Sequence, residues 1–114
     1  MDECLFCKMI AGDIPADVVY QDDDVLAFRD INPQAPVHVL IIPKRHISTL
    51  NDLASDDAAL IGKLSLAAAK IAVQEGIAES GYRTLINTNR EGGQVVFHIH
   101  MHLMGGRRML WPPG

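Results

Sequence analysis

The fold of this chain is limited first by a run of alternating residues near its C-terminal end, Phe97-His98-Ile99-His100-Met101-His102-Leu103-Met104. Side chains on a strand point to opposite faces in turn, so this spacing predicts three imidazoles on one face and apolar residues facing the core behind them. We predict that the strand covers residues 95–104. Neighbouring groups that titrate near neutrality cost stability when more than one is protonated, which indicates that something other than folding requires them.

The remaining sequence predicts short elements of both kinds around that strand. Gly12 ends a first helix, an acidic turn separates two β-prone runs, Pro43 closes a strand that is apolar on both faces, and Ser55 caps one long helix. We therefore predict an α+β fold, with an antiparallel sheet of about five strands, one long helix and a short N-terminal helix. The other predicted elements are a helix over 4–11, a hairpin of 18–20 and 25–28, a strand over 36–42, a helix over 55–76 and a strand over 82–87.

Length and charge exclude several classes of protein. With 114 residues, of which 48% are hydrophobic, the chain can form one core, so we predict a single domain over residues 1–114. A formal net charge of -4 argues against nucleic acid as a partner. The apolar run 37–42 is far shorter than the roughly 20 residues that span a membrane. Met1-Asp2-Glu3-Cys4 has no basic stretch leading into an apolar run, so we expect no signal peptide and a cytoplasmic location.

Groups near the alternating run favour phosphorus chemistry over a simple metal site, although a row of imidazoles can also bind zinc. Asn87, the segment Gly92-Gly93-Gln94 and the backbone of Val95 offer N–H donors and close backbone approach, which suit phosphate oxygens. His38 lies on the predicted third strand and His46 just beyond it. If that strand neighbours the last one, the five histidines converge, and His38 becomes a candidate for fixing the proton of a nucleophilic imidazole.

These residues resemble those of the histidine-triad (HIT) family, whose signature of alternating histidine and apolar residues corresponds here to residues 98–104. Further similar segments are 30–36, 42–47 and 92–94, and the ending 105–107 through Trp111-Pro112-Pro113-Gly114 looks like the Hint branch. The resemblance implies a HIT-like fold, a homodimer, and hydrolysis of purine nucleoside 5′-phosphoramidates without an organic cofactor. Trp111 could reach a partner's site or cover its own chain.

By the same resemblance, His100 is the nucleophile and forms a nucleotidyl-histidine intermediate that water resolves, a route that divides one hard displacement into two easier ones. His102, Asn87 and the backbone amides of Gly93 and Val95 would hold the phosphoryl oxygens. Asp30 would accept hydrogen bonds from the ribose. Several apolar residues would either contact the base or belong to the ordinary core: these are Phe6, Met9, Ile14, Phe28, Ile31 and Leu40.

One residue departs from the family pattern. Related proteins often carry a serine where this chain has Val95, so no hydroxyl assists the leaving group there. This departure favours one alternative function, a nucleotide-binding sensor or scaffold with little turnover. A second alternative is a dinucleoside polyphosphate hydrolase of the Fhit type, although the ending Trp111-Pro112-Pro113-Gly114 favours the Hint branch.

The pair Cys4 and Cys7 resembles the Cys-x-x-Cys that some HIT relatives use to hold zinc with two histidines, which here are His46 and His98. Such a Cys2His2 set would be structural and would fix the orientation of the triad. The alternatives are buried free thiols that act as small hydrophobic groups and a redox pair.

Overall fold

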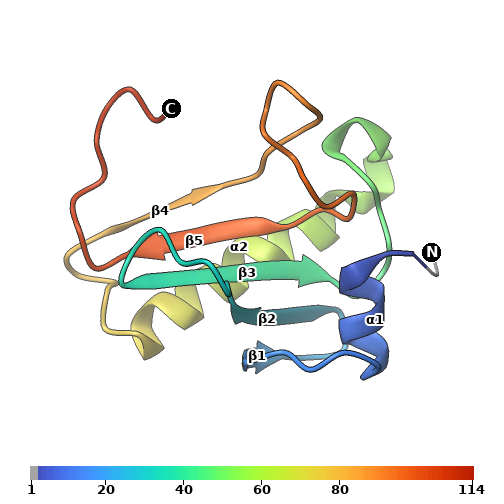
Figure 1. The fold of residues 1–114 in the computed structure, drawn as a ribbon, viewed down its shortest axis with the longest axis horizontal. Helices are drawn as coiled ribbons and strands as arrows, with labels where there is room; N and C mark the ends of the chain where they lie inside the picture. Colours follow the sequence, from blue (N-terminus) through green and yellow to red (C-terminus); the bar gives the residue numbers. More distant parts are fainter. Residues whose placement is uncertain (1–2) are drawn as a thin grey trace.

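One five-stranded antiparallel sheet organises the computed structural model, which describes residues 3–114 (Figure 1). The strand order is β1-β2-β3-β5-β4, so the predicted α+β fold is confirmed. Within residues 3–114, no helix has the length and apolarity needed to cross a membrane. Met1 and Asp2, which begin the segment examined for a signal peptide, lie outside the described residues. The elements are α1 (Leu5–Ala11), β1 (Val18–Gln21), β2 (Val25–Arg29), β3 (Val37–Pro43), the 3-10 helices η1 (Leu50–Asp52) and η2 (Ser55–Asp57), α2 (Ala58–Gln74), β4 (Tyr82–Leu85) and β5 (Met101–Gly105).

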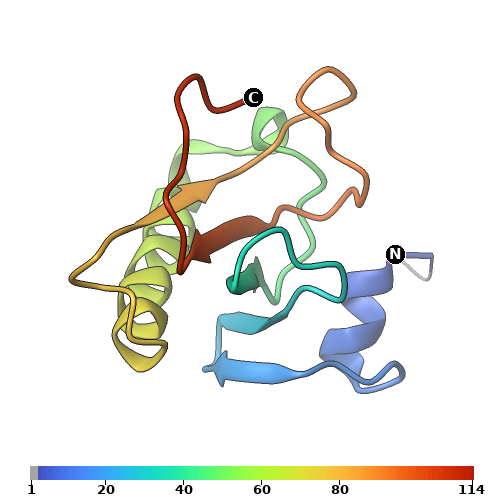
Figure 2. The same cartoon turned by 60° about the vertical axis from the view of Figure 1, so that its left-hand side comes forward.

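The central strand β3 is covered on both faces, as the apolar residues at both odd and even positions of its sequence predict. Val39 and Ile41 pack in the core beneath α2, whereas Leu40 and Ile42 pack with Phe6 of α1 on the other face. Figure 2 shows the two helices on opposite sides of the sheet. The long helix therefore covers the larger of the two core clusters, and the short helix leaves part of the second face open.

The long helix begins later than predicted. We expected Ser55 to cap it, but residues 55–57 form η2, and α2 begins at Ala58 with Asp57 as the preceding residue. The Asp57 carboxylate accepts a hydrogen bond from the Ala54 N–H at 2.8 Å and pairs with Arg45. This carboxylate therefore closes the turn of η2 that leads into α2, and within residues 3–114 no side chain caps α2 itself.

The last strand is also shorter than predicted and includes only one histidine of the three. β5 begins at Met101, so His98 and His100 precede it, where residues 96–98 bend. The Ile99 N–H donates to the Ile47 carbonyl at 2.8 Å instead of joining a strand ladder. Alternation persists through the bend, because the apolar residues at 99, 101 and 103 are all buried in the core beneath α2.

Two glycine substitutions test how the helices are held, and we expect them to have opposite signs. Gly12 ends α1 in the left-handed region, with φ of 84°, so Gly12→Ala should lower the free energy of unfolding by about 1 kcal/mol. Gly62 lies within α2 with open space around an added Cβ, so Gly62→Ala should raise it by about 0.5–1 kcal/mol. Urea unfolding measures both, and equal signs would contradict this assignment of the helix ends.

Candidate active site

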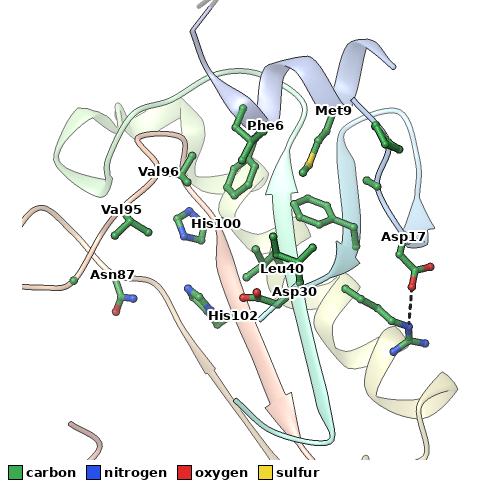
Figure 3. Close-up of a pocket in the computed structure, with 17 residues that line it drawn as sticks. Phe6, Met9, Asp17, Asp30, Leu40, Asn87, Val95, Val96, His100 and His102 are labelled. Carbon is green, nitrogen blue, oxygen red and sulfur yellow. Dashed lines mark ion pairs between the residues drawn. The ribbon is translucent and has the colours of Figure 1, made fainter. Parts of the chain in front are cut away.

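A cleft of about 480 Å³ lies between α1 and the open face of the sheet (Figure 3). In Figure 3, Phe6 and Met9 cover it from α1, while His100 and His102 lie beside Asn87 and Val95 at one end. Most of the residues predicted for the nucleotide line this cleft. They are Phe6, Met9, Phe28, Asp30, Ile31, Leu40, Asn87, Gly93, Val95, His100 and His102.

Sequence reasoning missed part of the lining and included one residue too many. Ile14 is not among the residues that line the cleft. Most of the missed residues adjoin predicted ones along the chain, which is the only signal that could have found them. Asp17 lies beside Arg29 because the Arg29 N–H, at the end of β2, donates at 3.0 Å to the carbonyl of Asp17, which immediately precedes β1. The missed residues are Leu5, Pro15, Ala16, Asp17, Arg29 and Val96.

His100 is held in one orientation and one tautomer. Its Nδ1 lies 2.8 Å from the His98 carbonyl oxygen, and because a carbonyl only accepts, Nδ1 carries the proton. The Phe6 ring packs edge-on against the imidazole, with 5.2 Å between ring centroids. In the neutral ring, Nε2 therefore keeps its lone pair, which is the arrangement that a nucleophilic imidazole needs.

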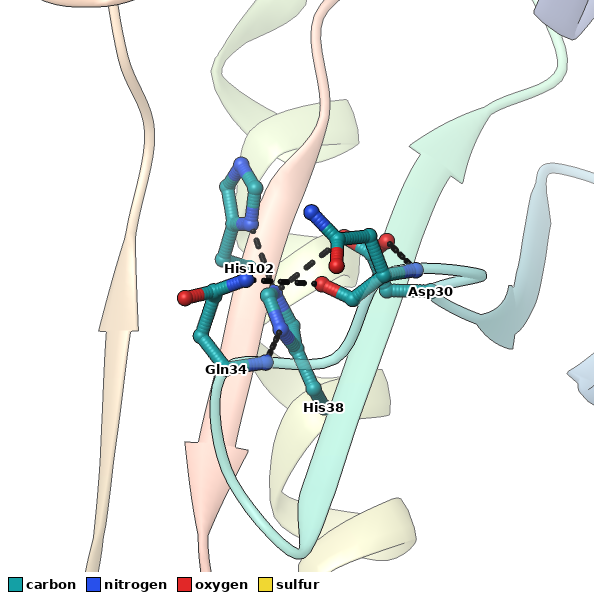
Figure 4. Close-up of polar contacts among 5 residues, drawn as sticks. Asp30, Gln34, His38 and His102 are labelled. Atoms are coloured by element: carbon teal, nitrogen blue, oxygen red, sulfur yellow. Dashed lines mark hydrogen bonds and ion pairs between the residues drawn. The ribbon is translucent and has the colours of Figure 1, made fainter.

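His102 is fixed through His38, which lies on the neighbouring strand as expected (Figure 4). The Gln34 N–H donates to His38 Nδ1 at 3.0 Å, so the neutral His38 ring carries its proton on Nε2. That Nε2 lies 2.9 Å from His102 Nδ1 and 3.4 Å from an Asp30 carboxylate oxygen. His102 Nδ1 therefore accepts, and its Nε2–H is a donor. Because His38 Nε2 is protonated, this cluster is unsuited to a metal ion.

Burial keeps both of these rings neutral. The pKa of His102 is lowered to about 4, chiefly by desolvation and also by the nearby His100 and His38, against the opposing effect of the Asp30 carboxylate. Desolvation also lowers the pKa of His38, against the opposing effect of Asp30. At neutral pH the rings of His38 and His102 thus act as N–H dipoles and not as imidazolium charges.

The loop before the histidines is anchored by a buried glutamine. The Gln94 side chain donates to the carbonyls of Ser48 at 2.8 Å and Val96 at 3.1 Å, and accepts from the Asn89 N–H. The Gly93 N–H donates to a carbonyl of the loop itself, at residue 90, so its expected role as a phosphate donor conflicts with the observed bond. Its neighbour Gly92 is required sterically, because an added Cβ would lie 2.4 Å from a carbonyl oxygen of the same loop.

The two cysteines and two histidines predicted as metal ligands lie together beside the cleft, with all four donor atoms within 4.8 Å of one another. His98 Nδ1 is 3.1 Å from His46 Nδ1, 3.4 Å from Cys4 Sγ and 3.6 Å from Cys7 Sγ. A tetrahedral zinc site would separate two nitrogens by about 3.3 Å and nitrogen from sulfur by about 3.6 Å. These residues could therefore hold a metal ion without rearrangement.

Comparison with known proteins agrees with this geometry. A family model described as "HIT domain" matches residues 11–109. Purine nucleoside phosphoramidase of Escherichia coli (strain K12) is 59% identical over 106 residues, which are 93% of this chain and 89% of that protein. A HIT family hydrolase from Legionella pneumophila Philadelphia 1 superposes with a TM-score of 0.96 at 57% identity, covering 98% of this chain and 100% of that one. A histidine triad nucleotide-binding protein from Candida albicans superposes with a TM-score of 0.82 at 33% identity, covering 96% of this chain and 83% of that one.

The lowered pKa of His102 predicts a loss of stability in acid. The unfolded chain protonates this histidine near pH 6.5, whereas the folded protein keeps it neutral down to about pH 4, so protons bind preferentially to the unfolded chain between these values. The free energy of unfolding should fall as the pH drops through this window, and it should fall less in His102→Gln. Urea unfolding across the window measures the difference, and ring-proton NMR reports the pKa directly. A His102 resonance that titrates near pH 6.5 would contradict the assignment.

Proposed function

The chain belongs to the histidine-triad (HIT) family and is an enzyme of the HIT hydrolase type, and on that basis we propose that it hydrolyses purine nucleoside 5′-phosphoramidates at the P–N bond. The observation that carries the proposal is the orientation of His100, whose Nδ1–H is held by the His98 carbonyl in the wall of an apolar cleft. The preference for purines follows the name of the E. coli relative.

In the first step, His100 Nε2 attacks phosphorus and the P–N bond breaks, with its electron pair remaining on the departing nitrogen. The carbonyl that accepts from Nδ1–H stabilises the positive charge that develops on the ring. His102 Nε2–H, the Asn87 side chain and the Val95 N–H donate to the phosphoryl oxygens. In the second step, water attacks phosphorus and loses a proton to solvent. The P–N bond to His100 breaks with its electron pair returning to Nε2, and a nucleoside 5′-monophosphate leaves.

Ribose and base occupy the other end of the cleft. The Asp30 carboxylate is oriented by the Asn32 N–H at 2.8 Å and has oxygen lone pairs left for ribose hydroxyls. Phe6 and Phe28 form an edge-to-face pair with 5.4 Å between centroids and offer apolar surface to the base. Ile31 is almost fully exposed, so it is available to cover a bound base.

The site has no hydroxyl at position 95, where related proteins often carry a serine near the departing amine. The Val95 side chain is 84% exposed, so water reaches this side of the cleft. We assign the proton that the amine takes up to solvent, which makes the rate more dependent on the basicity of the leaving group.

We infer that Cys4, Cys7, His46 and His98 hold a structural zinc ion. The support is the near-tetrahedral spacing of the four donor atoms, and the fact that His98 Nε2 donates to the Pro43 carbonyl at 2.8 Å, which leaves Nδ1 with its lone pair facing the cysteines. When bound, zinc would fix the start of α1 and the position of His98.

The zinc inference predicts one metal ion per chain. Cys7→Ala should lose the metal and lower the free energy of unfolding by at least about 2 kcal/mol, because metal binding contributes to folding. Lys8→Ala, on the same short helix, should keep it. Elemental analysis and thermal unfolding measure both effects, and a metal-free wild-type protein prepared without chelator would contradict the inference.

The predicted homodimer, single domain and cytoplasmic location extend this proposal. β4 is an edge strand with an unpaired side, and Leu66 and Val73, seven residues apart on α2, are exposed. Trp111 is 83% exposed and does not cover its own chain, which supports a role at a partner's site. Analytical ultracentrifugation would detect a monomer if the dimer is wrong.

The two hydrophobic core clusters pack on opposite faces of one sheet, which supports a single domain. Cys4 and Cys7 form no disulfide with each other, which suits the reducing cytoplasm.

The nucleophile is tested with adenosine 5′-phosphoramidate. His100→Ala should lower the rate of AMP release by at least about a thousandfold while AMP binding persists, because the substitution removes the attacking atom and leaves the base and ribose contacts in place. Activity is measured by chromatography and binding by calorimetry.

The same assay separates the alternatives. Wild-type turnover that survives in His100→Ala would move the nucleophile elsewhere. Binding of AMP by both proteins without turnover by either would favour a sensor, and faster cleavage of a dinucleoside polyphosphate offered in parallel would favour the other hydrolase.

A further inference from the structure

The tail that follows β5 passes close to the loop that joins β2 to β3, residues 30–36. Val37 and Gly105 are paired across β3 and β5, so this loop and the tail leave the sheet side by side at the same end (Figure 1). Gly106 lies in the left-handed region with φ of 88°, and an added Cβ would lie 2.8 Å from the Pro36 Cβ. The glycine therefore allows the tail to lie directly against the loop.

Arg107 fastens the tail to this loop through a backbone carbonyl. Its Nε–H donates to the Gln34 carbonyl at 3.1 Å, and one of its terminal nitrogens donates to the Arg108 carbonyl at 3.1 Å. No ion pair among residues 3–114 includes Arg107, so no carboxylate there competes with these neutral acceptors. Because a charged donor makes a stronger hydrogen bond than a neutral one, the guanidinium holds residue 34 at its carbonyl.

The N–H of the same residue faces His38 (Figure 4). The Gln34 N–H donates to His38 Nδ1 at 3.0 Å, and His38 Nε2 lies 2.9 Å from His102 Nδ1. The Gln34 side chain takes no part in this path, because its amide donates to the Asn32 carbonyl at 3.1 Å. Three hydrogen bonds in sequence therefore join the guanidinium of Arg107 to the ring of His102, and they pass through the main chain of residue 34.

The Gln34 N–H decides which nitrogen of His102 carries the proton. Without that donor, the neutral His38 ring could carry its proton on Nδ1, and its Nε2 lone pair would then face the lone pair of His102 Nδ1. The repulsion would be relieved by moving the His102 proton to Nδ1. His102 Nε2 would then present a lone pair to an anionic phosphoryl oxygen, and a donor that stabilises the transition state would be lost.

We propose that Arg107 is a positioning residue, which keeps the proton of His102 on Nε2 by holding the main chain of Gln34 against His38. Arg107 does not line the catalytic cleft, so it acts through these residues and not on the substrate. The effect on turnover rests on the proposed function, whereas the position of the proton is a property of the protein alone.

The proton position is measured by NMR of the ring nitrogens in the full-length protein at neutral pH, because protonated and bare imidazole nitrogens have different chemical shifts. Wild type should show a protonated Nε2 and a bare Nδ1 at His102. In Arg107→Ala, the two shifts should move toward each other as the second tautomer gains population. For adenosine 5′-phosphoramidate, kcat should fall about fivefold and KM should stay within about twofold, because the weakened donor acts in the transition state.

Three comparisons separate positioning from general support of the tail. Arg107→Lys keeps a charged donor and should restore most of both signals. Arg108→Ala removes the same charge from an exposed neighbouring side chain but keeps the Arg108 carbonyl, so both signals should stay at their wild-type values within about twofold. In a His38→Gln background, Arg107→Ala should change kcat by less than about twofold, because the path to His102 is already broken.

The outcomes distinguish this inference from the function beneath it. If Arg107→Ala leaves the His102 shifts unchanged, the inference is overturned, whatever happens to kcat. If the fall in kcat is equally large in the His38→Gln background, the arginine only supports the tail, and the inference is again overturned. If the shifts move as expected but wild type does not cleave the phosphoramidate, the proposed function fails while the assignment of Arg107 stands.

Discussion

The hydrogen bonds of the buried His98 hold both halves of the site together. Its Nε2–H donates to the Pro43 carbonyl at the end of β3, its Nδ1 faces the two cysteines, and its own carbonyl accepts from His100 Nδ1. With an exposed fraction of 0%, this ring cannot exchange these partners for water. An unpaired buried polar group costs about 1–3 kcal/mol, so the three contacts favour a single arrangement. The cluster of Cys4, Cys7, His46 and His98 and the imidazole of His100 are therefore parts of one structure, joined through His98.

A backbone amide sets the proton positions on the other side of the site. The Gln34 N–H fixes the His38 tautomer, and His38 in turn fixes that of His102. The carbonyl of the same residue accepts from Arg107, so the C-terminal tail helps to hold the loop that makes this assignment. Because a main-chain N–H fixes this tautomer, the identity of the side chain at residue 34 does not reveal the contact, and the sequence does not predict it.

Alternation in the sequence predicts which way the residues from 98 to 104 point, but not where the strand begins. The alternation holds because the apolar residues at 99, 101 and 103 must reach the core under α2. The hydrogen-bond ladder of β5 starts only at Met101, because Ile99 bonds to Ile47 and not to a neighbouring strand. The same distinction explains the cleft. The family resemblance predicts Phe28 and Asp30 as lining residues. The position of Asp17 depends on pairing between distant segments, and the hydrogen bond of the Gly93 N–H depends on a turn within its own loop. Contacts between distant segments decide what local patterns leave open.

The charge of the site bears on what it can bind. Arg29 lines the base end, but both of its terminal nitrogens pair with Glu75 and its Nε lies 3.7 Å from Asp17, so its charge is balanced there. The phosphoryl end offers neutral N–H donors, since His102 has a pKa of about 4 and stays uncharged at neutral pH. Dipolar donors stabilise one negative charge well and a chain of several phosphates poorly, and the whole protein, at -4, adds no compensating attraction. A phosphoramidate carries a single charge at phosphorus, so the electrostatics of the catalytic cleft favour it over a dinucleoside polyphosphate.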